Sequence, residues 1–188
     1  AILATGYMHE WIEARFGARF RDVEIAYSRE THPLGTGGAV WKAMEAASQE
    51  DVFVFNGDTF FDIDLAAFQS LHKSAGAVAS MALRPMRDFE RYATVQVDGN
   101  RITGFREKQP AEEGLINGGI YLLNRKNLAK MEMPETFSIE KDFFEKYAGR
   151  IRIAAFVCDG YFIDIGVPED YERAQAELQA DCRPLKGA

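Results

Sequence analysis

Hydrophobic and polar positions in the first third of the chain alternate between strand-like and helix-like patterns. The predicted strands are Ile2–Thr5, Val23–Tyr27 and Val52–Phe55, and the predicted helices are Met8–Phe16 and Ala39–Ala47. In the strands, apolar residues follow one another or alternate with polar ones, whereas in the first helix they recur at helical spacing. This order of elements predicts parallel strands with helices on both faces of the sheet.

The remaining two thirds of the chain predict further strands and helices. The strands are Val78–Leu83, Thr94–Val97, Arg101–Phe105, Gly119–Leu123 and Ile151–Val157, and the helices are Leu65–Ala75, Ser138–Tyr147 and one that begins at Pro168. Asp98-Gly99-Asn100 indicates a hairpin turn, because Asp-Gly tolerates positive φ angles. Ser138 is the expected N-cap of its helix. We predict an α/β fold with a doubly wound, mostly parallel (mixed) sheet, arranged as a Rossmann-like, three-layer α/β/α domain over residues 1–188.

The composition is typical of a globular protein from a reducing compartment. Hydrophobic residues make up 47% of the chain and charged residues 27%, which suits one domain with a hydrophobic core. No apolar run is long enough to span a bilayer, and the start shows no secretory signal. Cys158 and Cys182 alone do not make a disulfide framework. We therefore expect a cytoplasmic protein without a membrane partner.

The charge balance restricts the partners. With 22 Lys and Arg residues against 29 Asp and Glu residues, the formal net charge is −7. Such a chain lacks the basic face that sequence-independent nucleic-acid binding needs, so we expect no nucleic-acid partner. A small anionic substrate stays compatible with this charge, because local positive charge, backbone N–H groups or a metal ion suffice to bind it.

Two acidic residues stand where predicted strands end. Asp58 comes shortly after Val52–Phe55, and Asp164 directly follows the apolar Tyr161–Ile163. Ligands of open α/β sheets bind outside the carboxyl ends of the strands, and Mg²⁺ prefers carboxylate oxygens. If the two strands are neighbours, Asp58 and Asp164 would hold one Mg²⁺. The alternatives are a solvated turn residue at Asp58 and, at Asp164, an acid favoured by the dipole of the following helix.

A glycine-rich segment precedes the helix predicted at Ala39–Ala47. Glycines let a ligand approach the backbone closely, and a helix N-terminus favours phosphates or the polar edges of a base. The candidate nucleotide-binding residues are Leu34, Gly35, Thr36, Gly37 and Gly38. A purely structural loop is the alternative, since the Gly-Lys-Ser or Gly-Lys-Thr of a phosphate-binding loop is not present.

Two further motifs suit a sugar phosphate. In Glu107-Lys108 the acid can hold a sugar hydroxyl, and the lysine is a compact positive charge for a phosphate. In Asn117-Gly118-Gly119 the side-chain amide can bind hydroxyl groups. The alternatives are an exposed ion pair for the first motif and a turn with positive φ for the second. The histidines show no metal-ligand spacing and are expected at surface or partly packed positions: His9, His32 and His72.

Taken in order, these motifs resemble the sugar-phosphate nucleotidyltransferases over nearly the whole chain. The motifs are Pro33–Ala39, Asn56–Asp58, Phe105–Lys108, Ile116–Tyr121 and Phe162–Gly166. Three longer stretches are similar to one subgroup, the D-glycero-α-D-manno-heptose 1-phosphate guanylyltransferases, with the mannose-1-phosphate guanylyltransferases as near relatives. These stretches are Asn56–Asp64, Phe137–Phe143 and Gly160–Tyr171.

The resemblance implies a role for each candidate residue. In this family Leu34–Gly38 would contact the nucleobase, and Asp58 and Asp164 would hold Mg²⁺. Lys108 would bind the sugar phosphate and complete the catalytic set with the two acids. The implied substrate-binding residues are Tyr92, Glu107, Lys108, Asn117, Gly118 and Glu140.

The resemblance also implies a reaction. A phosphate oxygen of a sugar 1-phosphate attacks the α-phosphorus of GTP, and pyrophosphate leaves. The product would be a GDP-sugar for surface polysaccharide or another glycan. GTP and the sugar 1-phosphate are thus the expected partners, and the oligomeric state stays open, with a homodimer as one option.

Two features depart from the family pattern. The chain opens at the predicted strand Ile2–Thr5 without an initiator Met. We therefore expect that the family's first strand and its Gly-rich triphosphate loop are missing from this sequence. In addition, Tyr92 is followed by Ala93 where family members often carry glycine, and the extra methyl group would either narrow the sugar pocket or be harmless.

Two other classes of protein compete with a sugar-phosphate guanylyltransferase. Asp62-Ile63-Asp64 has the spacing of a metal-dependent glycosyltransferase. A sensor that binds nucleotide sugars without turnover would also fit a chain without a triphosphate loop. Both explain Glu107-Lys108 and Asp164 less well. Among the transferases, a mannose-1-phosphate guanylyltransferase or another nucleotide-sugar pyrophosphorylase is the alternative.

Overall fold

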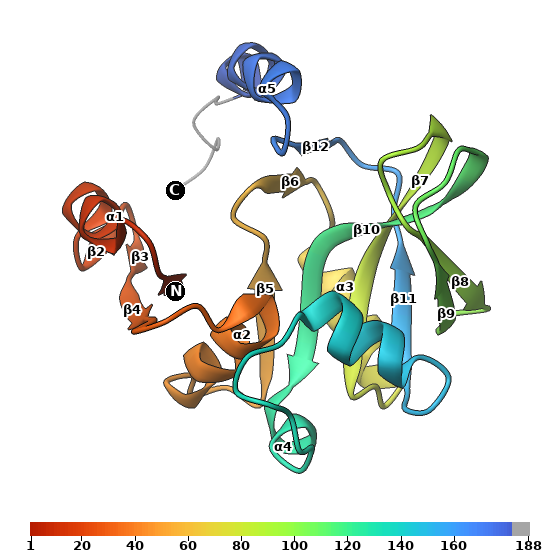
Figure 1. Ribbon diagram of the computed structural model, residues 1–188, viewed down its shortest axis with the longest axis horizontal. Coiled ribbons are helices and arrows are strands. Elements are labelled where there is room, and N and C mark those ends of the chain that lie inside the picture. The colour runs from red at the N-terminus through yellow and green to blue at the C-terminus, as the bar shows by residue number, and fades with distance from the viewer. Residues whose placement is uncertain (182–188) are drawn as a thin grey trace.

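The computed structural model describes residues 1–181, so Cys182 lies outside the described residues. The helices are α1 (His9–Phe16), α2 (Gly35–Glu45), α3 (Leu65–Ser74), α4 (Arg125–Leu128), the π-helical η1 (Ile139–Glu145) and α5 (Pro168–Asp181). The strands are β1 (Ile2–Thr5), β2 (Arg19–Phe20), β3 (Val23–Glu24), β4 (Ala26–Arg29), β5 (Asp51–Phe55), β6 (Thr59–Phe61), β7 (Ala79–Phe89), β8 (Thr94–Asp98), β9 (Arg101–Arg106), β10 (Ala111–Asn124), β11 (Ile153–Val157) and β12 (Phe162–Asp164). This is the mixed α/β architecture that the sequence predicts (Figure 1).

A six-stranded mixed sheet lies at the centre of the molecule. Its strand order is β5-β10-β7-β11-β9-β8. β10 runs antiparallel to β5 and β7, and β11 runs parallel to β7, so β5, β7 and β11 point the same way. Their carboxyl ends therefore share one edge of the sheet. The short pair β6–β12 lies beyond that edge (Figure 1).

Alternate residues of β7 pack on opposite faces of this sheet. Met81 and Leu83 belong to a core that includes Phe143 of η1 and residues of α2. Ala82 belongs to a second core with Phe68 of α3. Because side chains of a strand alternate between its two faces, one strand serves both cores, and the three-layer arrangement is confirmed.

The N-terminal residues form a smaller unit beside this sheet. β1 and β4 pair in parallel, with Ile2 opposite Ala26, and make a separate two-stranded sheet (Figure 1). The prediction of one strand over Val23–Tyr27 is wrong. Val23–Glu24 pairs with β2, and Ile25 donates its N–H to the carbonyl of Ala18 before β4 begins.

Two predicted boundaries are wrong for a common reason. α2 begins at Gly35 rather than at Ala39, and β10 begins at Ala111 rather than at Gly119. In both cases glycines that suggested a loop are packed inside the element. The predicted cap is confirmed, because the Ser138 hydroxyl accepts a hydrogen bond from the N–H of Lys141 at 3.2 Å.

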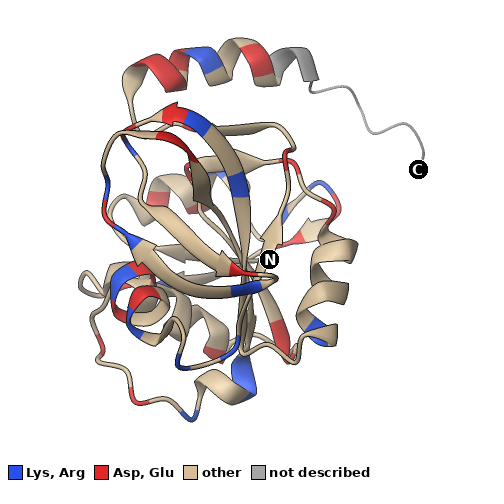
Figure 2. Ribbon diagram, turned by 90° about the vertical axis from the view of Figure 1, so that its right-hand side faces the viewer, with Lys and Arg blue, Asp and Glu red and all other residues tan. Residues whose placement is uncertain are grey.

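None of the helices within residues 1–181 combines the length and the apolar character that a membrane crossing needs. The charged positions of α5 are mostly acidic, with Arg173 among them, and the helix stands apart from the central sheet (Figure 2). Its first turn carries Glu169 and Asp170, where the positive end of the helix dipole favours acids.

Candidate active site

Asp58 and Asp164 lie on neighbouring strand ends. β12 pairs antiparallel with β6, and the register puts Asp164 opposite Thr59, the residue after Asp58. The N–H of Ile165 donates to the carbonyl of Asp58 at 2.9 Å and joins the two segments once more. The sequence left open whether the strands that carry the two acids are neighbours, and the β6–β12 pairing meets this condition.

Three groups surround the Asp164 carboxylate. Its Oδ1 accepts a hydrogen bond from the Gly166 N–H at 2.8 Å and lies 3.7 Å from Nη2 of Arg91. Tyr92 is the third group, since burial and secondly the negative charge of Asp164 raise the pKa of Tyr92 to about 12. Tyr92 is therefore a neutral hydroxyl at neutral pH. Asp58 is exposed, and its Oδ1 accepts from the Thr59 hydroxyl at 3.2 Å.

The strand register gathers three of the predicted sugar-binding residues. Thr94 of β8 pairs with the last residue of β9 and also with Ile116 of β10. Tyr92 lies just before β8, Glu107 just after β9 and Asn117 just after Ile116. The three side chains therefore start from adjacent points of the sheet, and Tyr92 connects this group to the acid pair.

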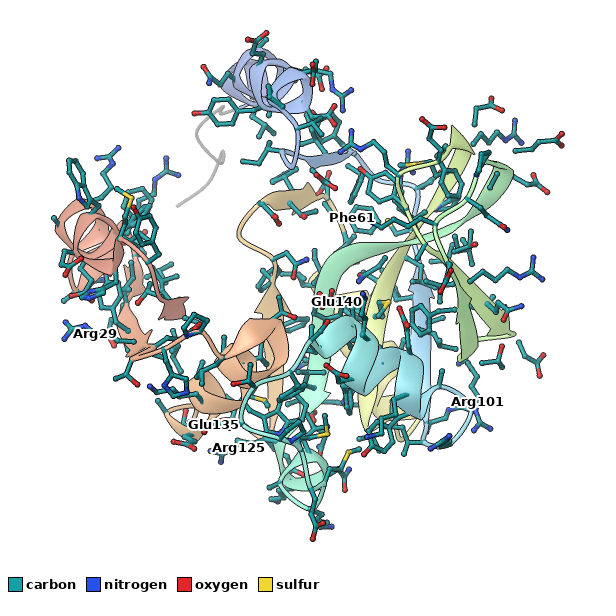
Figure 3. The ribbon with its side chains drawn as sticks, viewed as in Figure 1. Arg29, Phe61, Arg101, Arg125, Glu135 and Glu140 are labelled. Atoms are coloured by element: carbon teal, nitrogen blue, oxygen red, sulfur yellow. The ribbon has the colours of Figure 1, made fainter. Side chains whose placement is uncertain are left out.

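Asn117-Gly118-Gly119 forms a bulge inside β10. Between Asn117 and Tyr121 the register advances by four residues on β10 and by two on β7. A Cβ on Gly118 would lie 2.4 Å from the ring of Phe61, which is labelled in Figure 3, and Gly119 has a φ angle of 72°. The positive φ of the alternative interpretation is found at Gly119, but inside a strand bulge rather than in a turn. The bulge also contacts the segment that leads to Asp58, because the Asn56 N–H donates to the Gly119 carbonyl at 2.8 Å.

Tyr121 is a polar residue of this region that the sequence did not single out. It is fully buried, and its hydroxyl accepts a hydrogen bond from the Asn117 amide at 2.8 Å. The Asn117 Oδ1 accepts from the Gly119 N–H at 2.9 Å, so both ends of the amide are engaged. Burial, and secondly the charge of Glu140, raise the pKa of Tyr121. In the sequence, Tyr121 looks like any other aromatic residue of a core strand.

The glycines at the start of α2 allow the segment before η1 to pack closely against this helix. A Cβ on Gly37 would lie 2.1 Å from the ring of Phe137, and one on Gly38 would lie 2.3 Å from the carbonyl oxygen of Glu135. The Gly37 N–H donates to the Phe137 carbonyl at 2.9 Å, so this amide is not free to bind an anion. Leu34 is buried, whereas Gly35 and Thr36 are exposed. Only part of the segment is thus open to a ligand.

Thr36 joins this segment to Glu140. Its hydroxyl donates to Oε2 of Glu140 at 2.8 Å and accepts from the Ile139 N–H at 2.9 Å. The Ser138 hydroxyl donates to the same Glu140 oxygen at 2.8 Å. Glu140 thus lies beside the N-terminal end of α2 (Figure 3). The predicted nucleotide-binding segment and a predicted sugar-binding acid form one hydrogen-bonded unit.

Glu107 and Lys108 follow β9 and are exposed. Within residues 1–181 neither side chain takes part in an ion pair, so the salt-bridge interpretation does not apply to them. A lysine without an acidic partner keeps its full charge available for a phosphate.

The residues present fit a divalent cation that is shared with substrate. Within the described part of the chain no three His, Cys, Asp or Glu side chains gather to hold a metal ion. Asp58 and Asp164, whose backbone segments are paired, would supply two oxygen ligands. Mg²⁺ is commonly held by one or two carboxylates, with phosphates and waters completing its shell.

Two other features of the molecule contain none of the predicted site residues, although the second borders the site through Phe162, whose ring contacts that of Tyr92. His72 bridges Ser80 and Asp51 in the order of a catalytic triad, but Ser80 is 0% exposed and no substrate can reach it. The expectation of a surface or partly packed histidine is therefore wrong for His72. A hollow of about 900 Å³ is lined by residues other than the predicted site residues: Arg84, Pro85, Met86, Arg87, Glu113, Gly114, Leu115, Asp159 and Phe162.

Comparison with known proteins places the chain among nucleotide-transferring enzymes. Residues 4–181 match a family model described as nucleotidyl transferase. A D-glycero-alpha-D-manno-heptose 1-phosphate guanylyltransferase of Aneurinibacillus thermoaerophilus is 47% identical over 95% of this chain and 77% of the relative. One of Campylobacter jejuni is 44% identical over 90% of this chain and 75% of the relative. A mannose-1-phosphate guanylyltransferase of Mycobacterium tuberculosis is 31% identical over 97% of this chain, which spans 52% of that relative.

Solved structures share the fold. HddC from Yersinia pseudotuberculosis, complexed with GMP-PN, superposes with a TM-score of 0.81 and 30% identity, covering 94% of this chain and 77% of the HddC chain. A UDP-glucose pyrophosphorylase complexed with UDP-glucose has a TM-score of 0.73 at 18% identity, covering 96% of this chain and 80% of its own. At that identity the second likeness concerns the fold alone.

Proposed function

The chain belongs to the nucleotidyl transferase family, and from this premise we propose that it transfers a guanylyl group from GTP to a sugar 1-phosphate. D-glycero-α-D-manno-heptose 1-phosphate is the favoured acceptor, and mannose 1-phosphate is the alternative. The observation that carries the proposal is the β6–β12 pairing, which makes neighbours of Asp58 and Asp164. Identity to the two heptose 1-phosphate guanylyltransferases supports the choice of sugar and base.

The reaction needs two anionic reactants to approach each other. A phosphate oxygen of the sugar 1-phosphate forms a bond to the α-phosphorus of GTP, and the bond from that phosphorus to the bridging oxygen breaks and releases pyrophosphate. The attacking oxygen is already ionised near neutral pH, so no general base is required. Positioning and charge neutralisation then supply most of the rate.

Each predicted residue has a task in this reaction. Asp58 and Asp164 would hold Mg²⁺, which neutralises and aligns phosphate oxygens when it is bound. Lys108 would offset the charge of the attacking phosphate, and Glu107 would hold sugar hydroxyls. The further residues expected to contact substrates are Leu34, Gly35, Thr36, Gly37 and Gly38 for the nucleotide, and Tyr92, Asn117, Gly118 and Glu140 for the sugar.

The hydrogen bonds of Asp64 speak against the glycosyltransferase alternative. Its Oδ1 accepts from the Ala67 N–H at 2.9 Å, so this carboxylate caps α3. In an Asp-x-Asp metal site the two acids serve one cation. Because Asp64 caps α3, Asp62 has no second carboxylate at that spacing with which to hold a metal ion. A cytoplasmic location and the question of a homodimer stay predictions from the sequence.

Release of pyrophosphate is the measurement that tests the proposed function. The purified protein is offered each of four nucleoside triphosphates with heptose 1-phosphate or mannose 1-phosphate, and GTP with heptose 1-phosphate is expected to react fastest. Asp58→Asn and Asp164→Asn should each lower turnover by about 100-fold or more, because a preorganised charge partner is lost at the phosphates. The matched control is Asp62→Asn, an exposed acid in the same segment.

Two results would contradict the proposal. Turnover near that of the wild-type protein in both Asn variants would remove the cation site. No pyrophosphate release from any triphosphate, together with sugar transfer from a nucleotide sugar that is lost in Asp62→Asn, would favour the glycosyltransferase instead.

A further inference from the structure

Arg91 bridges two acidic side chains that come from different elements. Its Nη1 lies 2.6 Å from Oδ2 of Asp170, and its Nη2 lies 3.7 Å from Oδ1 of Asp164. Its guanidinium also lies over the ring of Tyr92, at 5.6 Å from the centroid. The segment before β8 is thereby tied both to the start of α5 and to the end of β12.

Asp170 is the fixed end of this bridge. Its side chain is only 13% exposed, it lies in the first turn of α5, and its Oδ1 is 3.1 Å from Nη1 of Arg173. The side chain of Arg91 is 43% exposed, and its short contact is with Asp170 rather than with Asp164. The contact with Asp170 therefore fixes the position of the guanidinium group. The positive charge of this group acts on Asp164 across a longer distance.

We propose that Arg91 is a positioning residue that competes with a divalent cation for the Asp164 carboxylate. This inference rests on the proposed function, in which Asp58 and Asp164 share a cation. Without a cation, the positive charge of Arg91 offsets part of the negative charge of the Asp164 carboxylate. A bound cation meets the same positive charge, so Arg91 weakens cation binding.

The competition is electrostatic and has a defined direction. Replacing Arg91 by glutamine removes a positive charge beside Asp164 but keeps a side chain that can hydrogen-bond. The affinity for a divalent cation should then rise by about three- to tenfold, as expected for one charge that acts on a partly exposed carboxylate. A residue with a purely structural role would show no change or a loss of affinity.

The experiment measures binding of Mn²⁺ to the purified protein by electron paramagnetic resonance, without nucleotide or sugar. Arg91→Gln is expected to bind more tightly than the wild-type protein. Arg91→Lys, which keeps the charge on a single nitrogen, should fall nearer to wild type. The matched control is Arg173→Gln, because Arg173 contacts Asp170 but not Asp164 and its loss should leave the affinity unchanged.

The outcomes separate this inference from the proposed function. A wild-type protein that binds no Mn²⁺ overturns both. Wild-type binding with equal or weaker binding in folded Arg91→Gln overturns the inference alone, as does an equal gain in Arg173→Gln. If Arg91→Gln does not fold, Arg91→Met decides in its place, since equal or weaker binding in that folded, uncharged variant contradicts the competition.

Discussion

His72 lies buried between α3 and the central sheet, at 2% exposure. Its Nδ1 is 2.7 Å from the Ser80 hydroxyl, and its Nε2 is 3.4 Å from Oδ1 of Asp51. Burial lowers the pKa of His72, although the nearby charge of Asp51 works in the opposite direction. The folded protein therefore holds His72 in its neutral form.

This histidine predicts how stability depends on pH. Below the ordinary histidine pKa of about 6.5, the unfolded chain takes up a proton that the folded protein does not, so the free energy of unfolding falls as pH decreases. The slope from this one group is at most about 1.4 kcal/mol per pH unit. Urea unfolding at several values between pH 5 and pH 8 measures it, with His72→Asn as the variant that cannot titrate. Equal slopes below pH 6.5 in both proteins would show that His72 is not responsible.

At the scale of elements, small residues of α2 allow this helix to pack closely against η1 and the segment that precedes it. Gly37 and Gly38 leave room for the chain at Glu135 and Phe137, and Thr36 bonds to Glu140. The ring of Phe137 packs edge-on against Trp41 of α2, with centroids 5.1 Å apart. The contact between the two helices thus depends on the absence of a side chain at two positions of α2.

Gly37→Ala tests this dependence. The new methyl group overlaps the buried Phe137 ring, which Trp41 holds in place, so the free energy of unfolding should fall by about 2 kcal/mol or more. For a chain of this size, each kcal/mol shifts the midpoint of thermal unfolding by roughly 2–4 °C. Gly57→Ala is the control, since a Cβ at Gly57 meets nothing within 4 Å. Equal midpoints for the two variants would contradict the packing role of Gly37.

At the scale of the whole molecule, the site depends on one contact between distant parts of the chain. β6 and β12 are separated by about a hundred positions in sequence, yet their pairing makes neighbours of Asp58 and Asp164. Gly160 lies just before β12, and a Cβ there would stand 1.9 Å from the carbonyl oxygen of Asp62. Because that oxygen belongs to the backbone, only a shift of the chain could relieve the overlap.

Gly160→Ala should therefore affect activity and stability together. We expect a loss of about 1–3 kcal/mol in the free energy of unfolding, as for other overpacked positions, and lower pyrophosphate release per folded molecule. Gly104→Ala is the control, because its Cβ would meet only the flexible end of Gln96. Full activity in folded Gly160→Ala would show that the alignment of the two acids tolerates a displaced β12.

Local patterns in the sequence predicted the type of the longer elements and the candidates for the site, whereas the short β2, β6 and α4 were not predicted. Apolar periodicity and turn chemistry are local properties, so α3 at Leu65–Ser74, the hairpin turn at Gly99 and the cap at Ser138 could be predicted from neighbouring residues. The motif order indicated the family. The glycines led to wrong predicted starts for α2 and β10. A glycine that ends an element and one that makes room for another segment look alike in a sequence.

Which of these residues lie next to one another could be seen only in the folded chain. The neighbouring positions of Asp58 and Asp164, the register that gathers Tyr92 with Asn117, and the Arg91 bridge depend on strand pairing between distant segments. Pairing is set by the packing of side chains from many elements at once, which no local pattern records. For the same reason, the sequence could not show that the buried hydroxyl of Tyr121 is hydrogen-bonded to the candidate site residue Asn117.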